Sequence, residues 1–96
     1  MPQKYEIETQ SDHATFFKEL PESIGNRPFE VQGNAVTVFD KGKVINITLG
    51  SEDLKHLGSL TLPMERIEFL FPEHTAEEAE AFMSAYRKRM LRVGGG

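Results

Sequence analysis

Residues 28–49 read PFEVQGNAVTVFDKGKVINITL, and apolar and polar side chains alternate through most of this stretch. A period of two residues, combined with many β-branched side chains, is typical of strands that bury one face. Gly33-Asn34 and Lys41-Gly42 suit two-residue hairpin loops, because such loops need positive φ angles that glycine adopts without steric cost. The stretch therefore predicts three antiparallel strands joined by two tight turns.

The two predicted loops also fix the register of the strands. The first loop places Val31 opposite Val36, and the second places Val38 opposite Ile45. Both assignments put one apolar set on the same face: Phe29, Val31, Val36, Val38, Ile45, Ile47 and Leu49. A slip of one residue in either hairpin would scatter this set over both faces. We therefore expect this face to be the sheet side of the core.

The residues before this stretch predict one strand and one helix. Lys4–Thr9 alternates in polarity and carries charges that favour an edge strand. Ser11 or Asp12 can cap a following helix, which Pro21 is expected to stop because proline disfavours helical conformation at the residue before it. The expected inner stripe of this helix is Ala14, Phe17 and Leu20, with Phe16 as a further candidate and Ile24 as a buried anchor beyond it.

The residues after the double hairpin first predict a short helical turn over 50–58, because Ser51 suits an N-cap and Gly58 suits a helix end. A short strand over 59–62 is expected next, with Leu60 and Leu62 facing inward. A turn over 63–65 then leads into a strand over 66–71, whose expected core residues are Ile67, Phe69 and Phe71.

The clearest helix is predicted over 75–92. Thr75 and Glu78 form a capping-box pattern, and apolar residues recur at helical spacing after it. The element order is thus β-α-β-β-β-β-β-α. We predict an α+β two-layer sandwich in which an antiparallel sheet of five to six strands carries both helices on one face. Residues 1–93 are expected to form a single domain, and the glycines at 94–96 a flexible tail.

Composition limits the classes of function. The 96 residues include no cysteine and carry a net charge of −4, which argues against nucleic acid as the default partner. The sequence contains no apolar run that could span a bilayer and no secretion signal at its start, so we expect a soluble, cytoplasmic protein without a membrane partner.

No catalytic or metal-binding motif is present in the sequence. His13, His56 and His74 are not at metal-ligand spacing and are interpreted as surface histidines. The acidic residues are explained by helix starts and turns, and neither a nucleophile elbow nor a phosphate loop is present. We therefore predict no catalytic residue, no metal and no cofactor, and favour a protein that is not an enzyme.

The opposite face of the sheet gives the main functional hypothesis. It carries more apolar side chains than a water-exposed face needs, and a basic cluster near the end of the last helix offers a further docking surface for an acidic partner. The candidate partner-binding residues are Phe39, Val44, Leu70, Thr37, Arg87 and Arg89.

We expect a non-enzymatic interaction module that binds a protein partner or a second copy of itself through this open sheet face. The alternative is a small-molecule-binding protein or small enzyme with a pocket between the sheet and the helices. Nucleic-acid binding through the last helix is a third hypothesis.

Overall fold

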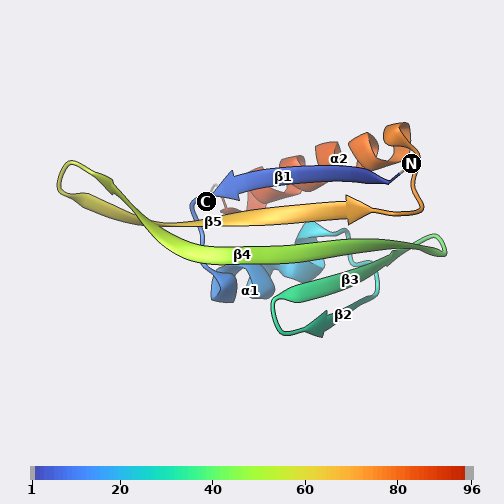
Figure 1. Ribbon diagram of the computed structural model, residues 1–96, viewed down its shortest axis with the longest axis horizontal. Coiled ribbons are helices and arrows are strands. Elements are labelled where there is room, and N and C mark those ends of the chain that lie inside the picture. The colour runs from blue at the N-terminus through green and yellow to red at the C-terminus, as the bar shows by residue number, and fades with distance from the viewer. Residues whose placement is uncertain (1, 95–96) are drawn as a thin grey trace.

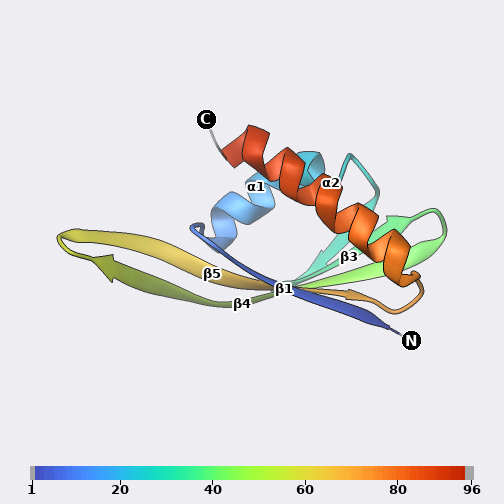
Figure 2. The same cartoon turned by 90° about the horizontal axis from the view of Figure 1, so that it is seen from above.

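A computed structural model describes residues 2–94 (Figure 1). The elements are β1 (Gln3–Thr9), α1 (His13–Ser23), β2 (Phe29–Gln32), β3 (Ala35–Asp40), β4 (Lys43–Leu57), β5 (Leu60–Phe71) and α2 (Ala76–Gly94). The strands form one antiparallel sheet in the order β1-β5-β4-β3-β2. Figure 2 shows both helices on one side of this sheet. The predicted α+β sandwich is therefore confirmed, with five strands.

The double hairpin has the register that the sequence predicts. Val31 pairs with Val36, and Val38 pairs with Ile45. Lys41 has a φ of 51° and Gly42 a φ of 80°. Lys41 accepts this unfavourable angle because a two-residue loop with positive φ at both positions matches the right-handed twist of the strands it joins.

The core lies between the sheet and the two helices. Phe69 of β5 contacts Tyr86 of α2 with ring centroids 5.0 Å apart, and Phe71 contacts Phe82 at 5.6 Å. The residues expected on the core face of β3, β4 and β5 are buried: Val36, Val38, Ile45, Ile47, Leu49, Ile67, Phe69 and Phe71. Phe29 and Val31 share their face but are exposed, since β2 is an edge strand with a neighbour on one side only.

The first helix differs from its prediction at both the inner stripe and the end. Asp12 is the N-cap and accepts a hydrogen bond from the Thr15 N–H at 2.8 Å, as expected. Pro21 lies inside the helix, so the prediction that it stops α1 was wrong. The last turn of α1 closes beyond Pro21, because the Ile24 N–H donates to the Leu20 carbonyl at 3.1 Å. Ala14 is exposed, which contradicts its expected place in the inner stripe.

The helical turn predicted over 50–58 does not exist. β4 continues to Leu57 and β5 begins at Leu60, so residues 58–59 are a hairpin loop in which Gly58 has a φ of 62°. Serine and glycine favour hairpin loops as well as helix ends, and strand pairing prevailed over the helical signal. The predicted turn over 63–65 is also part of β5, which leaves one strand where two were expected.

A β-bulge interrupts the pairing of these two long strands. Leu49 pairs with Ile67 and Glu52 pairs with Glu65, so the two residues Gly50 and Ser51 oppose the single residue Arg66. The extra residue reverses the alternation of faces along β4. Before the bulge, the buried residues of β4 have odd numbers. After it, the even-numbered Glu52 lies on the helix-facing side of the sheet.

The strand β5 runs without interruption, so its residues alternate from one end to the other. Leu60 and Leu62 consequently lie on the face opposite Phe69, and Leu60 is 61% exposed. Their predicted inward orientation was wrong, because it assumed a turn between residue 62 and residue 66.

The second helix begins as the capping box predicts. The Thr75 N–H donates to Glu78 Oε1 at 2.9 Å, and the Glu78 N–H donates to Thr75 Oγ1 at 3.1 Å. The helix continues to Gly94, past its predicted end at residue 92 and into the predicted tail. Gly95 and Gly96, the rest of that tail, lie outside the described residues.

A pair of phenylalanines on opposite faces tests this arrangement. Phe69→Ala should lower the free energy of unfolding by about 3–5 kcal/mol, because Phe69 is fully buried and its loss leaves a cavity. Phe39→Ala, on the open face, should cost less than about 2 kcal/mol, since Phe39 is already 37% exposed. Urea denaturation followed by circular dichroism measures both values, and equal losses would contradict the assignment of the two faces.

Candidate functional site

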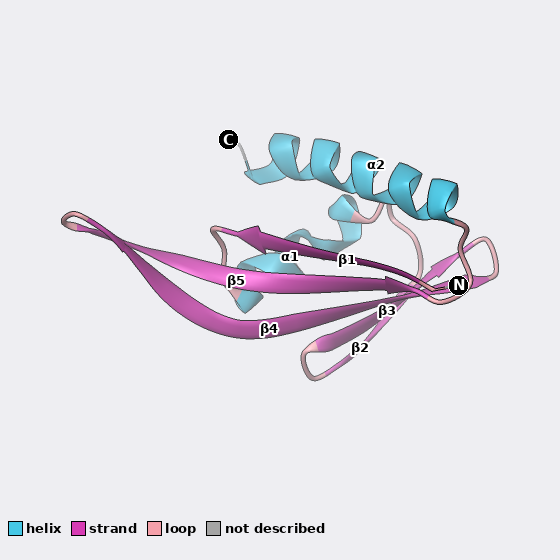
Figure 3. Cartoon of the chain, turned by 45° about the horizontal axis from the view of Figure 1, so that its top comes forward, coloured by secondary structure: helices cyan, strands magenta, loops and turns pink. Residues whose placement is uncertain are grey.

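The β4–β5 hairpin extends well beyond the rest of the sheet. We call residues 50–64 the arm; it contains only strand and a hairpin loop and projects away from both helices (Figures 1 and 3). Every residue from 51 to 60 is exposed, and the molecule measures 46 × 25 × 25 Å. The arm is therefore highly accessible along most of its length.

The arm carries the three most exposed large apolar side chains among the described residues. Leu54 is 65% exposed, Leu60 is 61% exposed and Leu57 is 49% exposed. Single exposed apolar residues are common on protein surfaces, but three within seven residues of a projecting hairpin are an unusual concentration of exposed apolar side chains.

One edge of the arm also has free backbone groups. β3 pairs with β4 as far as Thr48, and the Leu49 N–H donates to the Asn34 carbonyl at 2.8 Å. Within residues 2–94, no strand lies along the β4 edge beyond this point. An unpaired strand edge is a template for the addition of another strand.

A cluster of three titratable side chains lies at the base of the arm, where α1 begins. His13 Nε2 lies 2.8 Å from the Gly50 carbonyl oxygen and 3.7 Å from Glu65 Oε2. His13 Nδ1 lies 3.6 Å from Glu52 Oε1, which also accepts a hydrogen bond from the His13 backbone N–H at 2.7 Å. The bulge brings these groups together, because it turns Glu52 toward the helices.

Glu65 is the unusual member of this cluster. Its side chain is fully buried, and neither carboxylate oxygen has a hydrogen-bond partner among the described residues. Burial raises the pKa of Glu65 above its usual value, and the nearby His13 partly offsets this. The sequence interpretation placed Glu65 in a turn. In the structure, Glu65 continues the row of Ile67 and Phe69 along one face of β5.

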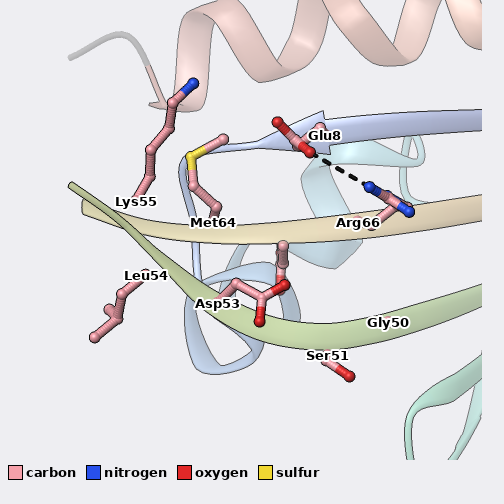
Figure 4. A pocket seen from close by; sticks show the side chains of 9 residues that line it. Glu8, Gly50, Ser51, Asp53, Leu54, Lys55, Met64 and Arg66 are labelled. Atoms are coloured by element: carbon pink, nitrogen blue, oxygen red, sulfur yellow. Dashed lines mark ion pairs between the residues drawn. The ribbon is translucent and has the colours of Figure 1, made fainter. Parts of the chain in front are cut away.

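A depression lies along the arm rather than between the sheet and the helices. It has a volume of about 430 Å³ and is lined mainly by polar and charged residues. Figure 4 shows Arg66 and Glu8 beside it, and their ion pair has an N–O distance of 3.7 Å. A ligand pocket is usually deeper and mostly apolar, so this depression gives little support to the small-molecule alternative.

The candidate residues from the sequence separate into two groups. Phe39 pairs with Val44, and Asn46 pairs with both Thr37 and Leu70, so the four predicted sheet residues lie on neighbouring rows of the open face. Arg87 and Arg89 lie on α2, in the other layer. Arg87 is exposed, whereas Arg89 is half-buried and its Nη1 lies 3.5 Å from the Ser23 carbonyl oxygen. The sheet residues and the arginines therefore do not form one surface.

A second histidine, His74, makes contacts that hold the fold together. His74 is buried, contrary to its interpretation as a surface residue, and its Nε2 lies 3.0 Å from Asp40 Oδ2. Arg27 Nε donates to Asp40 Oδ1 at 2.9 Å. Burial acts to raise the pKa of Asp40, but the hydrogen bonds from Arg27 and His74 outweigh it and hold this pKa below its usual 3.8. These contacts fasten the loop before α2 to the β3–β4 turn.

Comparison with known proteins does not identify the chain: no protein-family model, curated protein sequence or solved structure matches it. Among the described residues, neither helix is long and apolar enough to cross a membrane. The function must therefore be inferred from the residues themselves.

The Asp40 contacts give a prediction about pH. Asp40→Asn should lower the free energy of unfolding by about 1–3 kcal/mol at pH 7, the range for hydrogen bonds to a charged group. Because the pKa of Asp40 is lower in the folded state, this stability is present above the usual pKa of 3.8 and is lost as the pH falls through the folded-state pKa. The difference from the wild type should therefore shrink at pH 3.

Urea denaturation at pH 7 and at pH 3 measures this difference. Glu30→Gln is the matched control, because Glu30 is exposed, and it should change stability by less than about 0.5 kcal/mol at either pH. An Asp40→Asn effect of the same size at both pH values would show that the ionised carboxylate is not what stabilises this contact.

Proposed function

We propose that the protein is a non-enzymatic interaction module that binds a second copy of itself through the free β4 edge of the arm. The observation that carries this proposal is the coincidence of an unpaired edge with exposed leucines on one projecting hairpin. Edge-to-edge pairing would satisfy the backbone groups of the arm and cover part of its apolar surface.

The charge sequence of the edge favours a second copy over an unrelated partner. The residues read Glu52-Asp53-Leu54-Lys55-His56, with acids on one side of the leucine and bases on the other. In an antiparallel pairing centred on Leu54, Asp53 lies opposite Lys55 of the second copy, and the reverse pair forms by symmetry. Such self-complementarity is what a two-fold interface between identical chains requires.

The same pairing arranges the remaining side chains favourably. Leu54 meets Leu54 of the second copy, and Glu52 lies opposite His56. Directly opposed pairs of opposite charge or of apolar residues contribute roughly 0.2–1 kcal/mol each, and backbone hydrogen bonds add to them. A shift of the register by two residues would place Asp53 opposite Asp53 or Lys55 opposite Lys55, so the charges select one alignment.

The open sheet face remains the second candidate surface. Phe39, Val44 and Leu70 share this face, and Phe39 is 37% exposed. In an antiparallel edge pairing, the two-fold axis is perpendicular to the plane of the sheet. Phe39, Val44 and Leu70 of both copies would then lie on the same side of one continuous sheet. The proposed assembly thus extends the predicted surface instead of competing with it.

Charge reversal on the arm tests the proposal. Sedimentation equilibrium should show a monomer–dimer equilibrium for the wild type, and Asp53→Lys should weaken it by roughly 5- to 30-fold. The reason is that two attractive pairs become repulsive, at a combined cost of roughly 1–2 kcal/mol. The double variant Asp53→Lys/Lys55→Asp exchanges the two charges and should restore dimerisation.

The matched control is Glu30→Lys, which reverses a charge at an exposed position of β2, away from the arm, and should leave the equilibrium unchanged. A wild type that stays monomeric at millimolar concentration would overturn the proposal. Dimerisation that Asp53→Lys does not weaken, or that the double variant does not recover, would exclude this edge and this register.

A further inference from the structure

We infer that His13, Glu52 and Glu65 form a binding site for a divalent transition-metal ion at the base of the arm. One potential ligand atom from each side chain lies within 4.8 Å of the others. The three residues come from three different elements, α1, β4 and β5, and the fold brings them together at the bulge. This inference does not depend on the proposed dimer, because all three side chains belong to one chain.

The strongest observation is the environment of Glu65. Its carboxyl group is fully buried and receives no hydrogen bond from any described residue. A buried polar group without a partner costs roughly 1–3 kcal/mol, and a charged one costs more. The basic group beside it is the ring of His13, with Nε2 at 3.7 Å from Glu65 Oε2, a distance too long for a hydrogen bond. A bound cation would supply the missing partner.

The position of Glu52 adds a second reason. Glu52 and Glu65 are direct cross-strand partners, and both lie on the helix-facing side of the sheet. Two like charges directly opposite each other destabilise a sheet. A cation between the two carboxylates would convert this repulsion into attraction.

The distances around His13 fit a shared ion. Metal–nitrogen and metal–oxygen bonds of about 2.0–2.2 Å place neighbouring ligand atoms about 3–3.5 Å apart. His13 Nε2 lies 3.7 Å from Glu65 Oε2. Its 2.8 Å contact with the Gly50 carbonyl oxygen is a hydrogen bond that Nε2–H donates, so a bound ion would replace this proton and could take the carbonyl as a further ligand. Nδ1 faces Glu52 Oε1 at 3.6 Å, which places a carboxylate beside the second ring nitrogen, a common arrangement for metal-binding histidines.

The ligand types indicate the class of ion. Imidazole nitrogen favours ions such as Zn²⁺, whereas carboxylate and carbonyl oxygens also accept Mn²⁺. The His13 side chain is 20% exposed and that of Glu52 is 49% exposed, so water can complete the coordination. The mixed set favours a first-row divalent ion over Ca²⁺ or Mg²⁺, which prefer sites made of oxygen alone. Such an ion would fasten the base of the arm to the start of α1.

The test uses the full chain, treated with EDTA and then dialysed at pH 7.5. Isothermal titration with Zn²⁺ and, separately, with Mn²⁺ should show one ion per chain for at least one of the two metals. Glu65→Gln and His13→Gln should each weaken this binding at least about tenfold, the loss seen when a ligand or its supporting partner is removed. Co²⁺ should give visible absorption bands in the wild type that both variants lose.

Glu80→Gln is the matched control, because Glu80 is an exposed carboxylate on α2, away from the arm, and lies outside the cluster. It should bind like the wild type, and circular dichroism with urea denaturation should show that each variant is folded. Absence of binding for both ions would overturn the inference, and so would binding that Glu65→Gln leaves unchanged. Loss of binding in Glu80→Gln would assign the ion to the surface of α2 instead.

Discussion

The burial of one face of β3, β4 and β5 beneath two helices is the constraint on which the rest of this structure depends. The central strands contribute β-branched side chains and two phenylalanines, and α2 contributes the aromatic residues that contact them. Because side chains alternate along a strand, burying this face fixes which residues point to the open side. The position of the candidate residues Phe39, Val44 and Leu70 follows directly from this packing.

The bulge opposite Arg66 marks the limit of that core. Before the bulge, Ile45, Ile47 and Leu49 of β4 are buried; after it, every residue up to the hairpin loop is exposed. The insertion turns Glu52 toward Glu65 and the start of α1, and it begins the arm. A single irregularity thus generates both the proposed dimer edge and the proposed metal site, in agreement with the frequent occurrence of bulges next to functional sites.

The histidines at positions 13 and 74 show how similar residues acquire different roles. His74 contacts a carboxylate that Arg27 also binds, so the charges around it are balanced and its role is to hold two loops together. His13 contacts two carboxylates, and no arginine or lysine forms an ion pair with either of them among the described residues. This excess of negative charge, together with the orphaned oxygens of Glu65, distinguishes a candidate binding site from a structural contact.

The sequence determined the double hairpin, its register and the layer arrangement, because alternation and turn chemistry are local properties that tertiary contacts reinforce here. It also placed the four sheet residues of the candidate site on one face. It did not determine the arm: the signals at Ser51 and Gly58 are compatible with a helix end and with a hairpin loop, and cross-strand pairing with β5 selected the hairpin. The cluster at its base was equally hidden, since His13, Glu52 and Glu65 are distant in the chain and no local pattern connects them. Only the packing of α1 against the bulge brings their charges together, and the cost of burying Glu65 exists only once that packing has formed.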